Sequence, residues 1–251
     1  MDVGVVKWFD PAKEFSLTLS SSRTRLRATG AAMRSASMPL GLSTKADLAC
    51  IDAITSSMRM VKKGSALYRE NDPFGSIYAI HAGSFKTTVV LINGFTQVTG
   101  FHLVGDTLGL DGVFADHHQC EAIAIEDSCV RIIPFKRLEH LSGEVREIQR
   151  LVHRAMSSEI VRESELLLLL GKMSVDQRIA AFLLNLSGRF EARGYSPVEF
   201  SLQMSRGEIG SYLGITLETA SRAFSKLQSS GIVSVQGKRI CILDFDRLNR
   251  A

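Results

Sequence analysis

The chain has little of what builds disulfide frameworks, metal clips or membrane spans. It has only four cysteines, and no two of them are closer than nine residues: Cys50, Cys120, Cys129 and Cys241. The chain therefore has no C-x-x-C pair, and no zinc clip is predicted. Scattered cysteines in a chain of this size are typical of buried thiols in a reducing compartment. The apolar run Leu166–Leu170 is far too short to span a bilayer.

There is also little excess of charge of either sign. The 30 Lys and Arg residues stand against 26 acids, for a net charge of +4, which permits nucleic-acid binding without requiring it. Residues 1–30 lack the apolar core of a signal peptide, and Arg23, Arg25 and Arg27 interrupt the stretch where one would lie. The sequence therefore predicts a cytoplasmic protein that has no membrane partner.

The first forty residues are rich in Ser, Arg, Thr and Ala, and no sustained period is found in them. We expect a flexible N-terminal arm over residues 1–40. Residues 3–13 resemble the first strand of cold-shock domains, but the chain then reads Glu-Phe-Ser-Leu where those domains place base-stacking aromatics. This likeness is interpreted as accidental, and RNA binding through the segment is kept as an alternative hypothesis.

Residues 41–140 are predicted to form a β-rich domain. A short helix is expected over 44–58, where apolar residues recur at spacings of three. Short β-rich runs separated by Gly and Asp follow, and their spacing is typical of a sandwich or barrel. Asn93-Gly94 predicts a hairpin with a type I′ turn, because such a turn needs positive φ at both positions. The expected strands cover residues 67–68, 76–80, 85–91, 96–101, 122–125 and 129–133.

A long helix is predicted over residues 141–171. Its apolar residues step by four, three, four and three, which is the pattern of a helix that packs along a partner. A twin helix from a second copy is the simplest partner, although acidic residues between 159 and 165 would face their own copies near a two-fold axis. The run 166–170 is expected in the dimer interface and in the core between domains. The predicted homodimer interface consists of Val145, Ile148, Val152, Ala155, Met156 and Ile160.

Residues 172–251 are predicted to form a helix-turn-helix domain. Ser205, with Glu208 three residues later, has the spacing of a capping box that begins a helix. Gly214 lies where a left-handed residue is needed to end that helix. Thr216 starts a second helix, whose apolar residues fall on one face and whose polar residues fall on the other. Two short helices joined in this way are typical of a motif whose second helix enters the major groove of DNA.

The polar residues of the second helix include Glu218, Ser221 and Arg222, which are chemically suited to base edges. Arginine binds guanine through two hydrogen bonds, glutamate accepts from the cytosine amino group, and serine serves several bases. Two strand runs after Ser230 flank a Gly-Lys-Arg tip and indicate a β-hairpin wing over phosphates. From residue 205 to the last residue, seven Lys and Arg stand against four acids.

These features resemble the CRP/FNR superfamily of transcription regulators, within it the FNR/FixK-like branch, over about residues 40–250. Residues 218–222, Glu-Thr-Ala-Ser-Arg, are similar to the Glu-x-x-Ser-Arg recognition motif of that branch, and residues 101–106, 133–135 and 178–183 also read like it. The resemblance implies an α+β fold: an N-terminal cyclic-nucleotide-binding-like β-roll, a long dimerisation helix and a C-terminal winged helix-turn-helix.

The resemblance also implies a function. A homodimer would bind a palindromic double-stranded DNA site of the TTGAT…ATCAA kind, and RNA polymerase would be a further partner. By this similarity Glu218, Ser221 and Arg222 read bases, and Thr216 contacts phosphate. All the residues expected at phosphates are Ser205, Arg206, Thr216, Thr219, Lys226, Lys238 and Arg239.

Two effectors typical of the family are not expected here. Cyclic-AMP-binding relatives carry Gly-Glu and Arg-Ser pairs, whereas this chain has Gly109-Leu110 and no arginine at 118–121, so a cyclic phosphate would meet no guanidinium there. Oxygen-sensing relatives hold a [4Fe–4S] cluster with several cysteines in the N-terminal arm. Residues 1–40 contain none, and Arg131 occupies the matching β-roll position. We therefore expect a member that lacks the cluster cysteines, has no cofactor and responds to an unidentified effector.

Other kinds of site were weighed against this hypothesis. His117-His118 with Cys120 fits no common metal site, so no metal is expected, and adjacent histidines in a polar loop are more often solvated. Cys120 and Cys129 are candidates for redox-sensitive thiols. A β-roll enzyme with a helical tail would need convergent His and Glu ligands, which the sequence does not place at usable spacing. The sequence therefore predicts a regulator and not an enzyme.

Overall fold

The structure is a computed structural model that describes residues 54–251. The arm predicted over 1–40, the cold-shock-like opening, and most of the helix predicted over 44–58 lie outside the described residues. The end of that helix prediction is wrong, because strand β1 (Ser57–Val61) begins there and pairs with β8 (Ser128–Pro134). Pairing with a distant strand overrides a local helical period.

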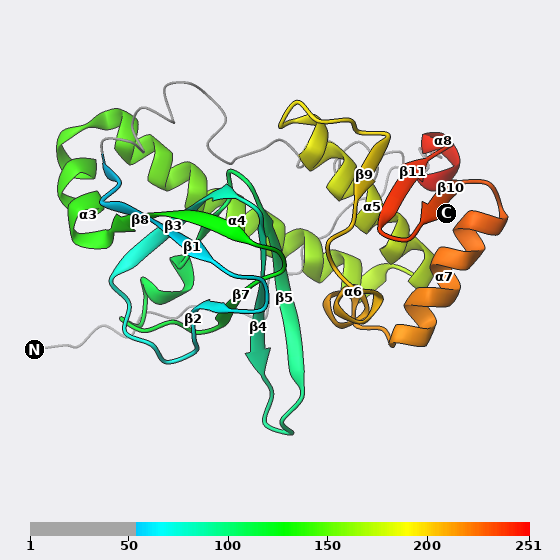
Figure 1. The fold of residues 1–251 in the computed structure, drawn as a ribbon, viewed down its shortest axis with the longest axis horizontal. Coiled ribbons are helices and arrows are strands. Elements are labelled where there is room, and N and C mark those ends of the chain that lie inside the picture. The colour runs from blue at the N-terminus through cyan, green and yellow to red at the C-terminus, as the bar shows by residue number, and fades with distance from the viewer. Residues whose placement is uncertain (1–53) are drawn as a thin grey trace, which may run out of the picture.

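Strands β1 to β8 form a β-roll of two four-stranded antiparallel sheets (Figure 1). One sheet has the order β1-β8-β3-β6 and the other β2-β7-β4-β5. The six predicted strands are present. The two that were not predicted are β1, which is mostly exposed and shows no alternation, and β6, which has only two residues. The other strands are β2 (Ala66–Tyr68), β3 (Ser76–Ala82), β4 (Ser84–Val90), β5 (Thr96–Leu103), β6 (Thr107–Leu108) and β7 (Glu121–Ala124).

Strands β4 and β5 form a long hairpin that extends beyond the rest of the β-roll (Figure 1). Val90 pairs with Thr96, so the loop between them is longer than two residues. Of the Asn93-Gly94 pair only Gly94 has a positive φ, of 79°. The Asn93 side chain instead accepts from the Phe95 N–H at 3.1 Å. The predicted hairpin is present, but the predicted type I′ turn is wrong, because an Asx-type contact closes a longer loop.

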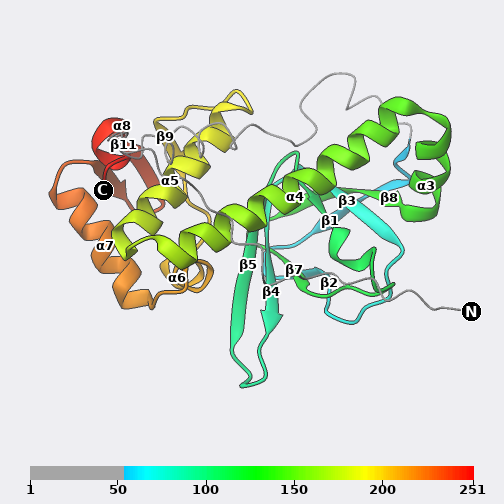
Figure 2. The same ribbon diagram turned by 180° about the vertical axis from the view of Figure 1, so that it is seen from behind.

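Two helices follow the β-roll, and not the single helix predicted from residue 141. These are α3 (Phe135–Glu144) and α4 (Arg146–Lys172), and Val145 between them is extended, with φ −117° and ψ 109°. Figure 2 shows α4 running along the β-roll towards the C-terminal domain. Helix α4 therefore connects the two halves of the chain.

The first part of the predicted dimer seam packs within the chain. Ile148 is buried in a cluster with Ile77 and Leu138, and Val145 and Val152 pack against that cluster. The assignment of Ile148 to a twin helix is thus corrected, since the β-roll already covers it. An apolar stripe shows that a helix is covered but does not say by what.

The C-terminal domain contains three main helices and a small sheet of order β10-β11-β9. Strand β9 was not predicted, because it has only three residues and pairs with a strand far along the chain. In the described part of the chain, no helix is both long and apolar enough to cross a bilayer. The elements are α5 (Val175–Glu191), β9 (Glu199–Ser201), α6 (Arg206–Leu213), α7 (Leu217–Ser229), β10 (Val233–Gln236), β11 (Arg239–Ile242) and α8 (Phe245–Leu248).

The β-roll and the C-terminal domain share one apolar core. Val98 and Phe101 of β5 belong to the same buried cluster as the residues of α5, α6 and α7. The Phe101 ring lies 6.0 Å from that of Phe182 and 5.2 Å from that of Tyr212, measured between centroids. Leu169, from the leucine run of α4, is also buried in this cluster. The part of the leucine-run prediction that concerned the core between domains is confirmed.

Candidate nucleic-acid interface

Hydrogen-bonded caps set the start of α6, the turn after it and the start of α7. The Ser205 hydroxyl accepts from the Glu208 N–H at 3.2 Å, and the Glu208 carboxylate accepts from the Ser205 N–H at 2.6 Å. Gly214 ends α6 with φ 64° and ψ 38°. Thr216 caps α7 by accepting from the Thr219 N–H at 3.2 Å. The predicted capping box, left-handed glycine and second helix start are confirmed.

Gly210 has a role that no sequence pattern predicted. A Cβ at this position would lie 2.7 Å from the carbonyl oxygen of Ile215. Only glycine therefore lets the turn approach α6 this closely. Glycine inside a predicted helix is itself the signal, because it is costly there and usually has a packing reason.

Helix α7 has one buried and one exposed face. Glu218 and Arg222 are exposed, and Ser221 is partly exposed. Hydrogen bonds from its own N–H and from Thr216 lower the pKa of Glu218, so this side chain is an anion that can only accept. The exposed face offers an acceptor, a hydroxyl and a guanidinium, which is the chemistry that reads base edges. The buried face consists of Ala220, Ala223, Phe224 and Leu227.

Three of the cations expected at phosphates already have partners. Lys226 forms an ion pair with Asp176 at the start of α5, and Arg239 forms one with Glu199. Lys238 lies at the tip of the wing and donates to a glutamine at 3.1 Å. All three cations are well exposed. Exposed ion pairs are weak, so a phosphate can replace these partners at little cost.

The other expected phosphate residues differ in how freely they can bind. The Arg206 guanidinium stacks on the Phe224 ring, 3.4 Å from its centroid, and the side chain is partly buried. This cation–π contact has to be kept or given up when a phosphate binds. Ser205 and Thr216 are exposed and Thr219 is partly exposed, and their hydroxyls lie at helix N-termini, which favour anions.

A second exposed surface on the chain is apolar and lies on α4. Ile160, Leu167 and Leu168 are 64%, 71% and 66% exposed. Met156 and Ala155, also predicted in the dimer interface, are partly exposed. At about 100° per residue, Met156, Ile160 and Leu167 project to the same side of α4 and form a stripe there, and Ala155 and Leu168 flank it. An exposed apolar stripe of this kind is typical of a protein–protein interface.

Both domains match family models: the cyclic nucleotide-binding domain over residues 58–144 and the Crp-like helix-turn-helix domain over residues 177–251. The chain is 44% identical over 207 residues to the Transcriptional activator protein anr of Pseudomonas aeruginosa, covering 82% of this chain and 84% of that protein. It is 43% identical over 198 residues to the Fumarate and nitrate reduction regulatory protein of Escherichia coli, covering 79% of each. Its fold matches the structure of FixK2 from Bradyrhizobium japonicum with a TM-score of 0.70 and 32% identity, over 77% of this chain and 96% of that one.

Identity at this level over most of both chains decides the family. The chain belongs to the CRP/FNR superfamily of transcription regulators. This confirms the predicted α+β fold with a cyclic-nucleotide-binding-like β-roll and a winged helix-turn-helix, which is the DNA-binding part. Members of the superfamily are typically dimeric, and they are regulators, so the alternative of a β-roll enzyme is set aside.

In this CRP/FNR chain a cavity of about 680 Å³ lies between the β-roll and α4. Gly109 and Cys120 line it, from the two segments in which cyclic-nucleotide-binding relatives hold the phosphate. Arg162 of α4 and Tyr212 of α6 line it as well. A cyclic phosphate in this cavity would therefore lie near one guanidinium, which the sequence did not predict, because α4 brings Arg162 there from a distant part of the chain.

A carboxylate of the chain itself binds the donors of this segment. Asp111 Oδ2 accepts from the N–H groups of Gln119 and Cys120, at 2.8 and 3.3 Å, and lies 3.4 Å from the Cys120 Sγ. Burial raises the pKa of the Cys120 thiol well above its usual value, and Asp111 raises it further. A protonated thiol is a poor nucleophile. The structure therefore argues against Cys120 as a redox-sensitive thiol.

His118 is not a solvated loop residue, which corrects the expectation from the sequence. It is 1% exposed, and its ring stacks on Tyr68 with the centroids 3.7 Å apart. Its Nδ1 lies 3.4 Å from Asp111. Over residues 54–251, no group of three His, Cys, Asp or Glu side chains is arranged to hold a metal ion.

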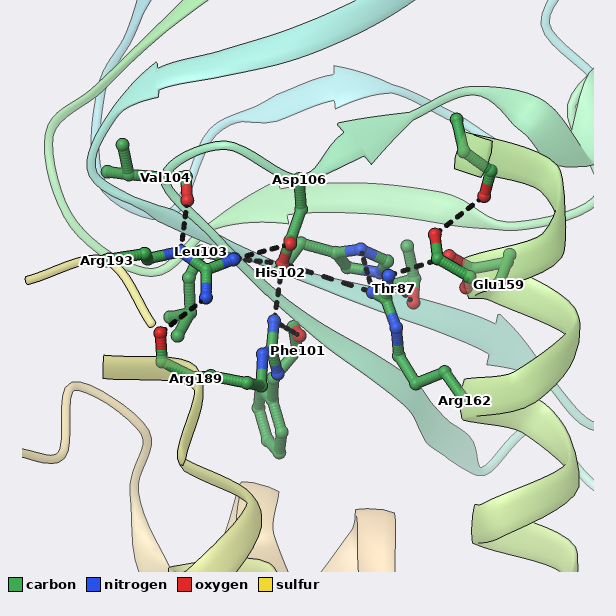
Figure 3. Close-up of polar contacts among 12 residues, drawn as sticks. Thr87, Phe101, His102, Leu103, Val104, Asp106, Glu159, Arg162, Arg189 and Arg193 are labelled. Carbon is green, nitrogen blue, oxygen red and sulfur yellow. Dashed lines mark hydrogen bonds and ion pairs between the residues drawn. The ribbon is translucent and has the colours of Figure 1, made fainter. Parts of the chain in front are cut away.

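A buried polar cluster at the junction of the two domains had no counterpart in the sequence patterns (Figure 3). Asp106, between β5 and β6, forms ion pairs with Arg189 of α5 and, at 2.7 Å, with Arg193. Arg162 lies 4.0 Å from it and 3.1 Å from His102 Nδ1. Burial alone would raise the pKa of Asp106, but the three arginines hold it well below its usual range. Burial, together with Arg162, lowers the pKa of His102 to about 3, so its ring is neutral.

Proposed function

We propose that the chain binds a palindromic DNA site of the TTGAT…ATCAA kind as a homodimer, with Glu218, Ser221 and Arg222 reading bases. The observation that carries the proposal is the exposed polar face of α7, on a helix whose other face is built into the core. The Glu-x-x-Ser-Arg spacing at 218–222 supports the same kind of site. Because Arg222 and the ionised Glu218 lie one turn apart, they can contact neighbouring base pairs.

The phosphate contacts of the proposal surround this face. Ser205, Thr216 and Thr219 lie at helix N-termini, and Lys238 extends from the wing. Lys226 and Arg239 would exchange carboxylate partners for phosphates, and Arg206 would act from its position over Phe224. Contacts of this kind orient the protein on DNA without specifying a sequence.

The dimer in the proposal uses the exposed stripe of α4. Its centre is Ile160, with Ala155, Met156, Leu167 and Leu168 along the same helix. Val145, Val152 and the buried Ile148 support this helix from the β-roll side instead. Two copies related by a two-fold axis would present two α7 helices, which matches the symmetry of a palindrome. By the same kinship with transcriptional activators, we extend the proposal to RNA polymerase as a partner.

Neither cyclic AMP nor a four-cysteine iron–sulfur cluster is the effector in this proposal. Asp111 already binds the backbone N–H groups of the phosphate segment, and its charge would repel a phosphate. Cys241 lies on β11 of the wing, whereas Cys120 and Cys129 lie in the β-roll, so these thiols do not fit one cluster. Cys50 lies outside the described residues.

A gel shift with the palindrome and a scrambled duplex tests the base readout. Arg222→Ala should weaken binding to the palindrome by about 1–3 kcal/mol and relax the preference at one base pair. Arg247→Ala is the matched control, because it removes the same charge from an exposed position on α8. The readout is wrong if Arg222→Ala binds as tightly as the parent, and the site is wrong if the parent does not prefer the palindrome.

Light scattering during gel filtration tests the dimer. Ile160→Glu places two charges against each other in the proposed interface and should give a monomer that retains its fold. Arg150→Glu is the control, since Arg150 is exposed on the same helix outside the proposed interface. A dimer of unchanged mass for Ile160→Glu would contradict the use of this stripe.

A further inference from the structure

Two sets of polar contacts hold the winged domain to the β-roll. The first joins the β4–β5 hairpin to α6. Lys86 Nζ lies 2.7 Å from the Glu208 carboxylate, and the Val98 N–H donates to the Ser211 hydroxyl at 2.9 Å. The Gln97 side chain donates to the Ser211 carbonyl. These contacts attach α6 to the two strands of the hairpin, away from its exposed tip at residues 91–95.

The second set is centred on Asp106, whose side chain is 6% exposed (Figure 3). Its Oδ2 accepts from the Leu103 N–H at 2.8 Å, which fixes the carboxylate to the β-roll. The same carboxylate binds Arg189 and Arg193, which belong to α5 and the residues just after it. Arg162 reaches the cluster from α4. One carboxylate is therefore the meeting point of the β-roll, α4 and α5.

The arginines of this cluster are oriented as well as neutralised. Arg189 also donates to the Phe101 carbonyl at 3.0 Å. Arg193 donates to the Val104 carbonyl, and it donates to the Arg189 carbonyl at 2.6 Å. Both guanidinium groups are thus fixed at once by a carboxylate and by backbone carbonyls of the β-roll. Such charge-assisted bonds are directional and tolerate little rotation.

The apolar contacts at the junction are less directional than these hydrogen bonds. Phe101 packs between Phe182 and Tyr212, and apolar burial is favourable over a range of relative positions because it depends on area. Buried ion pairs add little to net stability when their desolvation is counted, but their hydrogen bonds are directional. The apolar contacts hold the domains together, and the Asp106 cluster is the part able to select their angle.

We propose that Asp106 is a positioning residue for DNA binding, which sets the angle between the winged domain and α4 by holding Arg189 and Arg193. In a dimer that meets along α4, this angle sets the separation of the two α7 helices and so the spacing of half-sites that the protein accepts. The inference rests on the proposed palindrome-binding homodimer. Asp106 itself touches no DNA.

Spacer selectivity tests this role. Affinities are measured for the palindrome with its preferred spacer, for spacers one base pair longer and shorter, and for a single half-site. The variants are Asp106→Asn, which removes the charge at constant shape, and Arg193→Gln, which leaves two of the three arginines. Both should keep the half-site affinity within twofold of the parent, while the preference for the best spacer falls at least threefold.

Asp127→Asn is the matched control. It makes the same substitution in an exposed ion pair with Lys62 that lies wholly within the β-roll, and it should leave spacer preference unchanged. Circular dichroism checks folding, and if Asp106→Asn does not fold, Arg193→Gln carries the test alone.

Either of two results overturns the inference by itself. One is a folded variant with the spacer preference of the parent. The other is an equal loss of affinity for half-site and palindrome, which means damage to the winged domain and not a change of angle. A parent that does not prefer the palindrome at all overturns the proposed function, and this inference with it.

Discussion

The DNA-reading face and the domain junction are built in opposite ways. At the reading face the polar groups are exposed, and the residue that caps each helix is hydrogen-bonded to the residue three positions later, as Ser205 is to Glu208. At the junction the polar groups are buried, and their partners come from far along the chain: His102 and Arg162 are 60 positions apart, and Asp106 and Arg189 are 83 apart.

This difference teaches which part of the molecule tolerates change. Exposed side chains on a capped helix can be replaced with small effects on stability. A buried charge that loses one partner is left uncompensated, which is costly. We therefore expect mutations of the reading face to change DNA binding and mutations of the junction to change stability and geometry together.

The largest expected effect is at the apolar part of the junction. Phe101 is 2% exposed, and Phe101→Ala should lower the free energy of unfolding by about 3–5 kcal/mol because it removes a core aromatic shared by both domains. Phe95→Ala, at the 71% exposed hairpin tip, is the control and should stay within about 0.5 kcal/mol of the parent. Urea unfolding measures both. Equal losses of stability at the two positions would contradict the importance given to the apolar junction.

A smaller effect concerns pH. The pKa of His102 is about 3 in the folded protein, below its ordinary value of 6.5, so only the unfolded chain gains this proton as the pH falls below 6.5. The free energy of unfolding should therefore decrease by about 1.4 kcal/mol per pH unit from this residue. His102→Gln should flatten the urea-unfolding profile between pH 6.5 and 4.5. His153→Gln, at an exposed position on α4, is the control, and equal flattening by both would contradict the assignment.

The smallest effect is expected at the reading face. Thr216→Ala removes the cap of α7 and should cost about 1 kcal/mol of stability. It should also weaken binding to the palindrome, because Glu218 loses a hydrogen bond from Thr216. Thr216→Ser keeps the hydroxyl and should restore most of both losses. A loss as large as that of Phe101→Ala would erase the difference between the two regions.

How far the sequence could predict each part follows from the same contrast. Capping boxes, Gly214 and the two faces of α7 are local patterns, and the structure confirms them. The apolar period of residues 141–155 also corresponds to a buried helix face, but Ile148 on that face is covered by the β-roll and not by a twin helix. A period records burial and not the identity of the covering element.

The junction and the cavity wall could not be predicted, for a physical reason. Arg162 looks like one more charge on a helix, and Asp106 looks like a turn residue beside a glycine. Only the fold brings them within reach of His102 and of each other. Burial and opposite charge make such a cluster important, and neither property is visible in local spacing.

The hairpin contacts with the winged domain have a consequence for how such regulators diversify. Lys86, Gln97 and Val98 all contact α6 and leave the exposed face of α7 uninvolved. The residues of the reading surface can therefore be substituted without changing the contacts that hold the winged domain to the β-roll. A library of variants randomised at positions 218, 221 and 222 could be screened for binding to new operator sequences while the contacts between the domains stay the same.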